Sequence, residues 1–399
     1  MSKQVQDAYI VAATRTPIGK SHKGYLRNMR PDDLLATTMK AVLAQVPGLD
    51  PQAIEDVVCG CAIPEAQQGL NVARISAVLA GLPVGVGGVT VNRFCASGLT
   101  ALQMAADRIR VGEADVMIAA GVESMSMVPM MGNSPSLSPS IFEREGDVGI
   151  AYGMGLTAEK VAQRWKVSRD AQDVFALQSH QRALAAQQAG DFAAEITPIT
   201  VTDRGVDIAR GEAVSRSRTV DLDEGPRPDT SIEGLAKLRT VFAARGSVTA
   251  GNSSQTSDGA GALLVVSEAA LKRFNLTPLA RFVSYASKGV PPEIMGIGPI
   301  EAIPVALRHA GLSLQDIDWI ELNEAFAAQS IAVMQQLGMD PAKVNPMGGA
   351  IALGHPLGAT GAIRAATVVH ALQRNKLKYG MVTMCVGMGQ GAAGILERI

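Results

Sequence analysis

The sequence predicts a layered α/β fold made of two similar halves with an insertion, and two observations lead to this prediction. First, short apolar runs alternate with stretches of helical periodicity, which is typical of layered α/β proteins. The apolar runs predict buried strands at 8–13, 115–121, 261–267, 319–323 and 380–387. The helical patterns lie at 31–46, 99–111, 171–189, 299–310 and 359–373. Second, the segments 94–124 and 354–389 both run through a turn, a helix, a polar link, an apolar strand and a glycine.

The predicted helix at 171–189 has well-marked ends. Ser168 can cap its N-terminus, and Asp170 and Asp173 favour its first turn because carboxylates are stabilised near the positive end of a helix dipole. Gly190 can end the helix in a left-handed conformation.

The repeated order of elements predicts how the chain is divided. We expect an N-terminal half at 1–120 and 249–275, an inserted loop domain at 121–248, and a C-terminal half at 276–399. The insertion differs in texture, because Met, Ser, Pro and Gly dominate its start and charges cluster at 201–229. We expect it to lie over one face of the two halves.

The charge balance argues against nucleic acid or an anionic membrane as a partner. The chain has 36 Lys and Arg against 37 Asp and Glu, so it has no basic excess to attract a polyanion. Its 47% of hydrophobic residues are ample for a core. The N-terminus lacks a signal sequence, no long apolar run predicts membrane insertion, and the C-terminus carries no peroxisomal tripeptide. We expect a cytoplasmic protein.

The four cysteines predict free thiols. Their spacing offers neither a disulfide framework nor the paired cysteines of a zinc site, so we expect no metal centre. Cys59 and Cys61 share one face of a predicted strand and have no other polar partner nearby, which favours a place in the core.

Cys95 is the first candidate for chemistry. It lies in VNRFCASGL, at a turn directly before a helix, where free backbone N–H groups and the helix dipole are expected to lower its pKa. The small neighbours Ala96, Ser97 and Gly98 would let a substrate approach closely. The alternative is a buried structural cysteine.

His355 and Cys385 are the next candidates. His355 lies in the glycine-rich turn of GGAIALGHPLGATGA, which takes the place that FCASG holds in the first half, so stacking the two halves would bring the turns together. Histidine is the usual general base at neutral pH, although it could also serve only the turn. Cys385 ends a strand and opens VGMGQGAAG, whose backbone N–H groups could hold an oxyanion.

Asn323 and Glu324 follow another strand end, in LNEAF. Asn323 could hold a water or polarise a carbonyl, and Glu324 could cap a helix.

Two apparent motifs are set aside. ATRTPIGKS resembles part of a phosphate-binding loop, but Thr14 replaces its first glycine and Pro17 removes a backbone N–H. GMGQG lacks the spacing of a dinucleotide-binding fingerprint. The remaining histidines have no partner motif, and we expect solvated positions for His22, His180, His309 and His370.

Taken together, the candidate segments resemble those of one family. NRFCASG, TAGNSSQTSDGAGA, LNEAFA, NPMGGAIALGHPLGATG and MCVGMGQGAA are similar to the successive signature segments of thiolases, in the family order. The resemblance covers essentially the whole chain. The segment YASKGVPPEIMGIGPIEAIPVAL is more similar to the degradative 3-ketoacyl-CoA branch than to the short-chain biosynthetic branch.

The resemblance implies two stacked βαβαβ halves in five layers with an inserted loop domain. It also implies acyl-CoA and coenzyme A as substrate and co-substrate, with no prosthetic group. A homodimer or homotetramer is expected, and a hydratase/dehydrogenase subunit is a possible partner.

The resemblance also assigns roles to the candidate residues. Cys95 would be the nucleophile, His355 the base that activates it, and Cys385 the second acid and base. Asn323 would fix a water that forms one oxyanion hole with His355. The backbone N–H groups of Cys95 and Gly387 would form the other.

A second set of positions would contact the coenzyme. Arg227 and Ser254 match positions that touch its nucleotide and pantetheine, and Met154 matches a residue of the acyl and pantetheine channel. Ala250 and Phe326 complete this binding set.

The expected function is therefore that of a 3-ketoacyl-CoA thiolase of fatty acid β-oxidation, an acyltransferase with ping-pong kinetics through an acyl-Cys95 intermediate. The first alternative is an acetoacetyl-CoA thiolase that works in the condensing direction, although Gly153 stands where some short-chain members carry histidine. A carrier-protein-dependent condensing enzyme would be expected to place histidine at Asn323 or Cys385. A non-catalytic acyl-CoA-binding protein would not need both thiols.

Overall fold

The computed structural model describes residues 5–144 and 146–399, and its centre is one ten-stranded sheet. The strands are β1 (Tyr9–Arg15), β2 (Gly19–Lys20), β3 (Asp56–Gly60), β4 (Val89–Val91), β5 (Val116–Ser124), β8 (Ser257–Val266), β9 (Ala280–Gly289), β10 (Trp319–Leu322), β11 (Tyr379–Val386) and β12 (Gln390–Arg398). Two further strands form a separate hairpin, β6 (Ile199–Asp207) and β7 (Glu212–Val220). The helices are α1 (Pro31–Ala44), α2 (Val72–Leu79), α3 (Ser97–Arg110), α4 (Met154–Arg164), α5 (Arg169–Ala189), α6 (Ile232–Ala236), α7 (Glu268–Phe274), α8 (Gly298–Ala310), α9 (Ala327–Leu337), α10 (Ala350–Leu353) and α11 (Thr360–Asn375).

The strand pairing repeats itself, which confirms the predicted duplication of the fold. In the first half, β3 pairs parallel to β5, β5 antiparallel to β8, and β8 antiparallel to β1. In the second half, β10 pairs parallel to β11, β11 antiparallel to β12, and β12 antiparallel to β9. A parallel bridge from Ile320 to Val344 takes the place of the β3–β4 pair. Two residue pairs between β1 and β9 join the halves.

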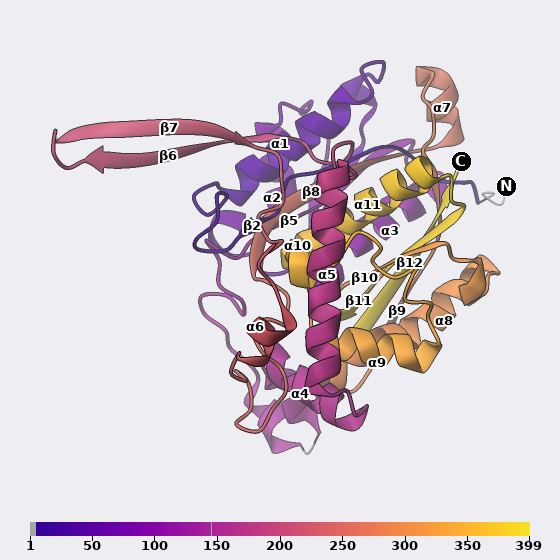
Figure 1. Ribbon diagram of the computed structural model, residues 1–399. Coiled ribbons are helices and arrows are strands. Elements are labelled where there is room, and N and C mark those ends of the chain that lie inside the picture. Colours follow the sequence, from indigo (N-terminus) through magenta and orange to yellow (C-terminus); the bar gives the residue numbers. More distant parts are fainter. Residues whose placement is uncertain (1–4, 145) are drawn as a thin grey trace.

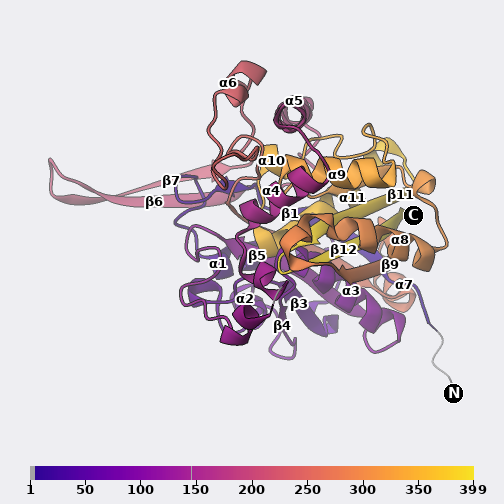
Figure 2. The same ribbon diagram turned by 90° about the horizontal axis from the view of Figure 1, so that it is seen from below.

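Helices and sheet halves stack in five layers. Figure 2 shows α1 and α2 on one side of the molecule and α8 and α9 on the other. Strand residues alternate between two cores, as a period of two requires: Met117 of β5 faces the central layer, and its neighbour Ile118 faces the outer one. The central layer is α3 and α11, which share one apolar core. Helices α1 and α2 cover the outer face of the first half, and α8 and α9 cover that of the second.

The starts of the two central helices approach each other closely. A Cβ atom added at Gly98 of α3 would lie 2.6 Å from the backbone N of Ala362, and one added at Gly361 of α11 would collide with the backbone of Leu99. Glycine is therefore needed at both positions. This close approach brings together the two turns that precede α3 and α11.

The segment between β5 and β8 holds α4, α5, the β6–β7 hairpin and α6. The capping prediction for α5 is confirmed: the Ser168 side chain accepts a hydrogen bond from the N–H of Ala171, and Gly190 has a φ of 75°. Helix α5 packs against α9 and α10, but the hairpin projects away from the body of the molecule (Figure 1). The expectation that the whole insertion lies over one face is therefore wrong for the charged residues of the hairpin. The division of the chain at 120, 248 and 275 stays a prediction.

Candidate active site

Cys95 lies in a tight turn between β4 and α3. Phe94, directly before it, has a φ of 43°, a left-handed conformation that is uncommon for a residue with a side chain. The hydroxyl of Ser97 holds the turn, because it accepts a hydrogen bond from the N–H of Arg93 at 2.9 Å and donates one to the carbonyl of Phe94 at 2.7 Å. The thiol is thus carried by a strained and well-braced segment.

The expectation of a lowered pKa for Cys95 is wrong. Its side chain is buried, and burial raises the pKa of the thiol to about 11. The backbone N–H groups of Gly387 and of Cys95 itself lower the pKa, but burial has the larger effect. Both N–H groups therefore face the sulfur, and the resting side chain is a neutral thiol.

This pKa leads to a pH prediction. The thiolate is the form that reacts with iodoacetamide, and its fraction grows tenfold with each pH unit below the pKa. In the free enzyme, alkylation of Cys95 should therefore accelerate throughout the range from pH 7 to pH 10. Alkylation rates followed by mass spectrometry at several pH values test this. A rate that is already constant above pH 7 would show instead a preformed thiolate–imidazolium pair.

His355 and Asn323 form a buried hydrogen-bonded pair. The Nδ2 atom of Asn323 lies 3.3 Å from Nε2 of His355, and the other ring nitrogen, Nδ1, lies 2.6 Å from Oγ1 of Thr360. Burial, assisted by the positive charge of Arg364, lowers the pKa of His355 to about 3, so the imidazole is neutral at pH 7. Oδ1 of Asn323 is buried and has no hydrogen-bond partner among the described residues.

The turn that carries His355 is fixed by the first half of the molecule. The N–H of His355 donates to the carbonyl of Gln255 at 3.1 Å and to Oγ of Ser257 at 3.2 Å. The carboxylate of Glu123, at the end of β5, accepts a hydrogen bond from the N–H of Gly358 at 2.8 Å. Residues from both halves therefore set the position of the imidazole.

Cys385 lies near the end of β11. It is fully buried in an apolar cluster with Met154, Ala325 and Phe326. Burial raises the pKa of its thiol, and the charge of a Cys95 thiolate would raise it further, so the two sulfur atoms lie within electrostatic reach of each other.

A cavity of about 410 Å³ opens in front of Cys95 and His355. Its wall is mainly apolar and rich in methionine, with Met125, Met130, Met131, Met154 and Met295. Ser254 and Phe326 also line it. A smaller cavity of about 40 Å³ shares the wall residues Cys95, Met130, Met131, Met154 and Leu357. The two cavities therefore adjoin each other at Cys95.

Comparison with known proteins shows which family has this arrangement. The family models of the thiolase N-terminal and C-terminal domains match residues 8–269 and 276–398. The chain belongs to the thiolase family. It is 49% identical over 395 residues to a 3-ketoacyl-CoA thiolase of Bacillus subtilis, covering 98% of this chain and 100% of that protein. The family prediction is thereby confirmed.

Two further proteins are similar to this chain over its whole length. An acetyl-CoA acetyltransferase of Pseudomonas aeruginosa is 46% identical over 404 residues, covering 99% of this chain and 100% of that protein. The crystal structure of human mitochondrial 3-ketoacyl-CoA thiolase in complex with CoA has a TM-score of 0.87 and 39% identity, covering 100% of both chains. The thiolase fold is therefore confirmed, and the chain is an acyltransferase.

In this thiolase, two of the expected coenzyme-contacting residues do not line the cavity. Arg227 and Ala250 are exposed. The backbone N–H of Arg227 donates a hydrogen bond to Nδ1 of His180 at 3.2 Å. Nε2 of Gln255 donates one to the carbonyl of the nearby Gly225 at 3.1 Å. The loop of Arg227 is thus braced beside the cavity and leaves its side chain free in solvent.

The expectation of solvated histidines is wrong for one residue. His180 of α5 is buried, and its Nδ1 accepts a hydrogen bond from the backbone N–H of Arg227. His370 is partly buried, and its Nε2 lies 2.9 Å from the carbonyl of Ala13. His22 and His309 are exposed, as expected.

Several residues around the site were not found from the sequence. Thr360 could have been noticed, because it follows His355 by five residues in the same glycine-rich segment. Gln255 and Glu123 gave no local sign, because their partners lie far away in the chain. The same holds for the cavity residues Phe242 and Met295.

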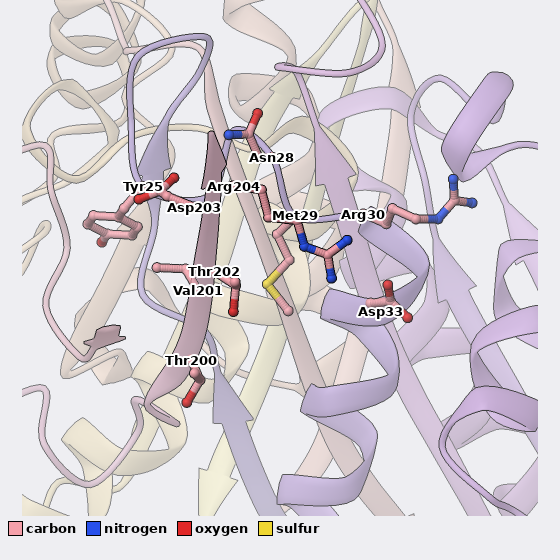
Figure 3. Close-up of a pocket in the computed structure, with 10 residues that line it drawn as sticks. All are labelled: Tyr25, Asn28, Met29, Arg30, Asp33, Thr200, Val201, Thr202, Asp203 and Arg204. Carbon is pink, nitrogen blue, oxygen red and sulfur yellow. The ribbon is translucent and has the colours of Figure 1, made fainter. Parts of the chain in front are cut away.

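A larger cavity, of about 520 Å³, lies elsewhere, between β6 and the segment that leads into α1 (Figure 3). Its wall mixes Arg30 and Arg204 with Asp33 and Asp203, and it has neither a thiol nor an imidazole. None of the candidate catalytic residues lines it, so its size alone does not make it the active site of this thiolase.

Proposed function

We propose that this thiolase cleaves 3-ketoacyl-CoA with free coenzyme A to give acetyl-CoA and a shortened acyl-CoA, as in fatty acid β-oxidation. The observation that carries this proposal is the position of Cys95 and His355 in the wall of one methionine-rich cavity, with Cys385 within electrostatic reach of Cys95. The apolar cavity can hold the pantetheine and acyl parts of the substrate. The two thiols can supply the nucleophile and the second acid and base that its cleavage needs.

In the first half-reaction, the Cys95 thiol gives its proton to the neutral His355 and attacks the 3-keto carbon. The C2–C3 bond then breaks, the acyl group stays on Cys95 as a thioester, and acetyl-CoA leaves as an enolate. Cys385 donates the proton that converts this enolate to acetyl-CoA. His355 and a water held by Asn323 would stabilise the enolate oxygen, and the partnerless Oδ1 of Asn323 is available to hold such a water.

In the second half-reaction, Cys385 removes the proton of incoming coenzyme A. The resulting thiolate attacks the acyl carbonyl, and the shortened acyl-CoA leaves while Cys95 recovers its proton through His355. The N–H groups of Cys95 and Gly387, which face the Cys95 sulfur, would hold the oxygen of the tetrahedral intermediate. This chemistry needs no metal and no prosthetic group.

The coenzyme would bind along the cavity. Met154, Ser254 and Phe326, which line it, would contact the pantetheine, and Arg227 and Ala250 on the rim would lie near the nucleotide. The side chain of Arg227 is exposed to solvent, so its guanidinium is accessible to a phosphate group or an adenine ring of the coenzyme.

The assembly and the setting of the enzyme are also proposed. We propose a homodimer or a dimer of dimers, a cytoplasmic location, and a possible association with a hydratase/dehydrogenase subunit. Among the residues that the structure describes, no helix is long and apolar enough to cross a membrane.

A second candidate function is the formation of acetoacetyl-CoA by condensation, favoured by the likeness to the acetyl-CoA acetyltransferase of Pseudomonas aeruginosa. It would use the same residues in reverse. Chain length separates the two functions, because only the degradative enzyme needs room for a long acyl group.

We expect medium and long 3-ketoacyl-CoAs to be cleaved at least as well as acetoacetyl-CoA. The flexible side chains of Met130 and Met131, at the junction of both cavities, can repack around tails of different length. Each buried methylene contributes about 0.8 kcal/mol at most, so kcat/KM should rise over several carbons and then level. Thiolysis rates for substrates of four to sixteen carbons test this. A steady decline from the four-carbon substrate onward would favour the acetoacetyl-CoA thiolase.

A further inference from the structure

Thr360 is the residue in contact with the far side of the His355 ring. It is the first residue of α11 and is buried, with Oγ1 2.6 Å from Nδ1 of His355. The same Oγ1 lies 3.0 Å from the carbonyl oxygen of Pro356. Thr360 lines neither cavity, so it is positioned to act on the imidazole and not on the substrate.

The two contacts of this hydroxyl determine where its hydrogen lies. A carbonyl oxygen can only accept, so the hydroxyl hydrogen points to Pro356. Oγ1 is then left as an acceptor towards Nδ1 of His355, which must carry the ring hydrogen. The opposite arrangement would place the lone pairs of two oxygen atoms against each other at 3.0 Å.

The other side of the ring agrees with this assignment. The amide Nδ2 of Asn323, which can only donate, lies 3.3 Å from Nε2 of His355. Nε2 therefore carries a lone pair. Burial and the charge of Arg364, which lower the pKa of His355, keep the ring in this singly protonated form at neutral pH.

We propose that Thr360 is a positioning residue that fixes the Nδ1–H tautomer of His355. This inference rests on the proposed function, in which the proton of the Cys95 thiol moves to Nε2, whose lone pair faces the Asn323 amide in the resting enzyme. Nδ1 keeps its hydrogen throughout. Its bond to Oγ1 strengthens once the ring becomes a cation, since hydrogen bonds from charged donors are stronger. Without the hydroxyl, the ring could adopt the other tautomer, which cannot accept that proton.

Two matched substitutions separate the hydroxyl from the packing of the side chain. Thr360→Val keeps the shape and removes the hydroxyl, whereas Thr360→Ser keeps the hydroxyl and removes a methyl group. We expect Thr360→Val to lower kcat for thiolysis by roughly 10²-fold, the scale of general base catalysis. The KM values should stay within about twofold, because Thr360 does not line the cavity. Thr360→Ser should retain most of the wild-type kcat. Equal damage in both variants, or full activity in Thr360→Val, would overturn the proposal.

A spectroscopic measurement on the wild-type enzyme does not depend on how the variants fold. In protein with ¹⁵N-labelled histidine, the His355 resonances, identified by their loss in His355→Asn, should show a protonated Nδ1 and an unprotonated Nε2. In Thr360→Val, the Nε2–H form should appear. An Nε2–H form in an active wild-type enzyme would overturn this inference alone. A wild-type enzyme with the expected tautomer but no thiolase activity would remove only the proposed function.

Discussion

The Cys95→Ala variant should have no measurable thiolase turnover and should form no covalent acyl-enzyme. An alanine offers no nucleophile to form the acyl-enzyme, and Cys385 acts in the proposed mechanism as an acid and a base, not as the nucleophile. The wild-type enzyme, given a 3-ketoacyl-CoA without free coenzyme A, should gain the mass of one acyl group. Intact-protein and peptide mass spectrometry would assign that mass to Cys95.

The two structural cysteines are the controls for this experiment. Cys59 and Cys61 are fully buried in the outer core of the first half, and burial raises the pKa of both thiols. Cys61→Ala should still form the acyl-enzyme, even with reduced stability. Iodoacetamide should label Cys95 in the wild-type protein, and prior acylation should protect it. Label found only on Cys59 or Cys61 would remove Cys95 from the mechanism.

The layered fold and the meeting of the two turns could be predicted because their causes are local and repeated. Strand length and helix periodicity indicate the elements, and Ser168 and Gly190 mark the ends of α5 where the structure has them. The equal order of elements in both halves places Cys95 and His355 before equivalent helices. The glycines at Gly98 and Gly361 then allow these helix starts to touch.

The pKa of Cys95 could not be predicted, because it depends on burial by distant segments. The turn before α3 does provide N–H groups that favour a thiolate, but burial of the sulfur has the larger and opposite effect on its pKa. The burial of His180 could not be predicted for the same reason. Its position in the helical pattern gives no sign that the distant loop of Arg227 contacts it. Local sequence indicates which groups are present, and tertiary packing decides which charge state they adopt.

The Cys385→Ser variant should separate the two half-reactions. A serine hydroxyl is a far weaker acid and base than a thiol, so it can neither protonate the acetyl-CoA enolate nor activate coenzyme A efficiently. Thiolysis of a 3-ketoacyl-CoA should fall by roughly 10²-fold or more. Transfer of an acetyl group to Cys95 from an activated aryl thioester should persist, because its leaving thiolate needs no proton.

The control for Cys385 is the same change at a cysteine that has no role in the chemistry. Cys59→Ser replaces an equally buried thiol at the end of β3, so it measures the damage that a buried hydroxyl causes by itself. If thiolysis falls equally in both variants, the loss at Cys385 is structural. If Cys385→Ser keeps full thiolysis, the second acid and base must be another group. The proposed mechanism requires a third outcome, in which Cys385→Ser loses thiolysis, Cys59→Ser does not, and both still become acylated on Cys95 by the aryl thioester.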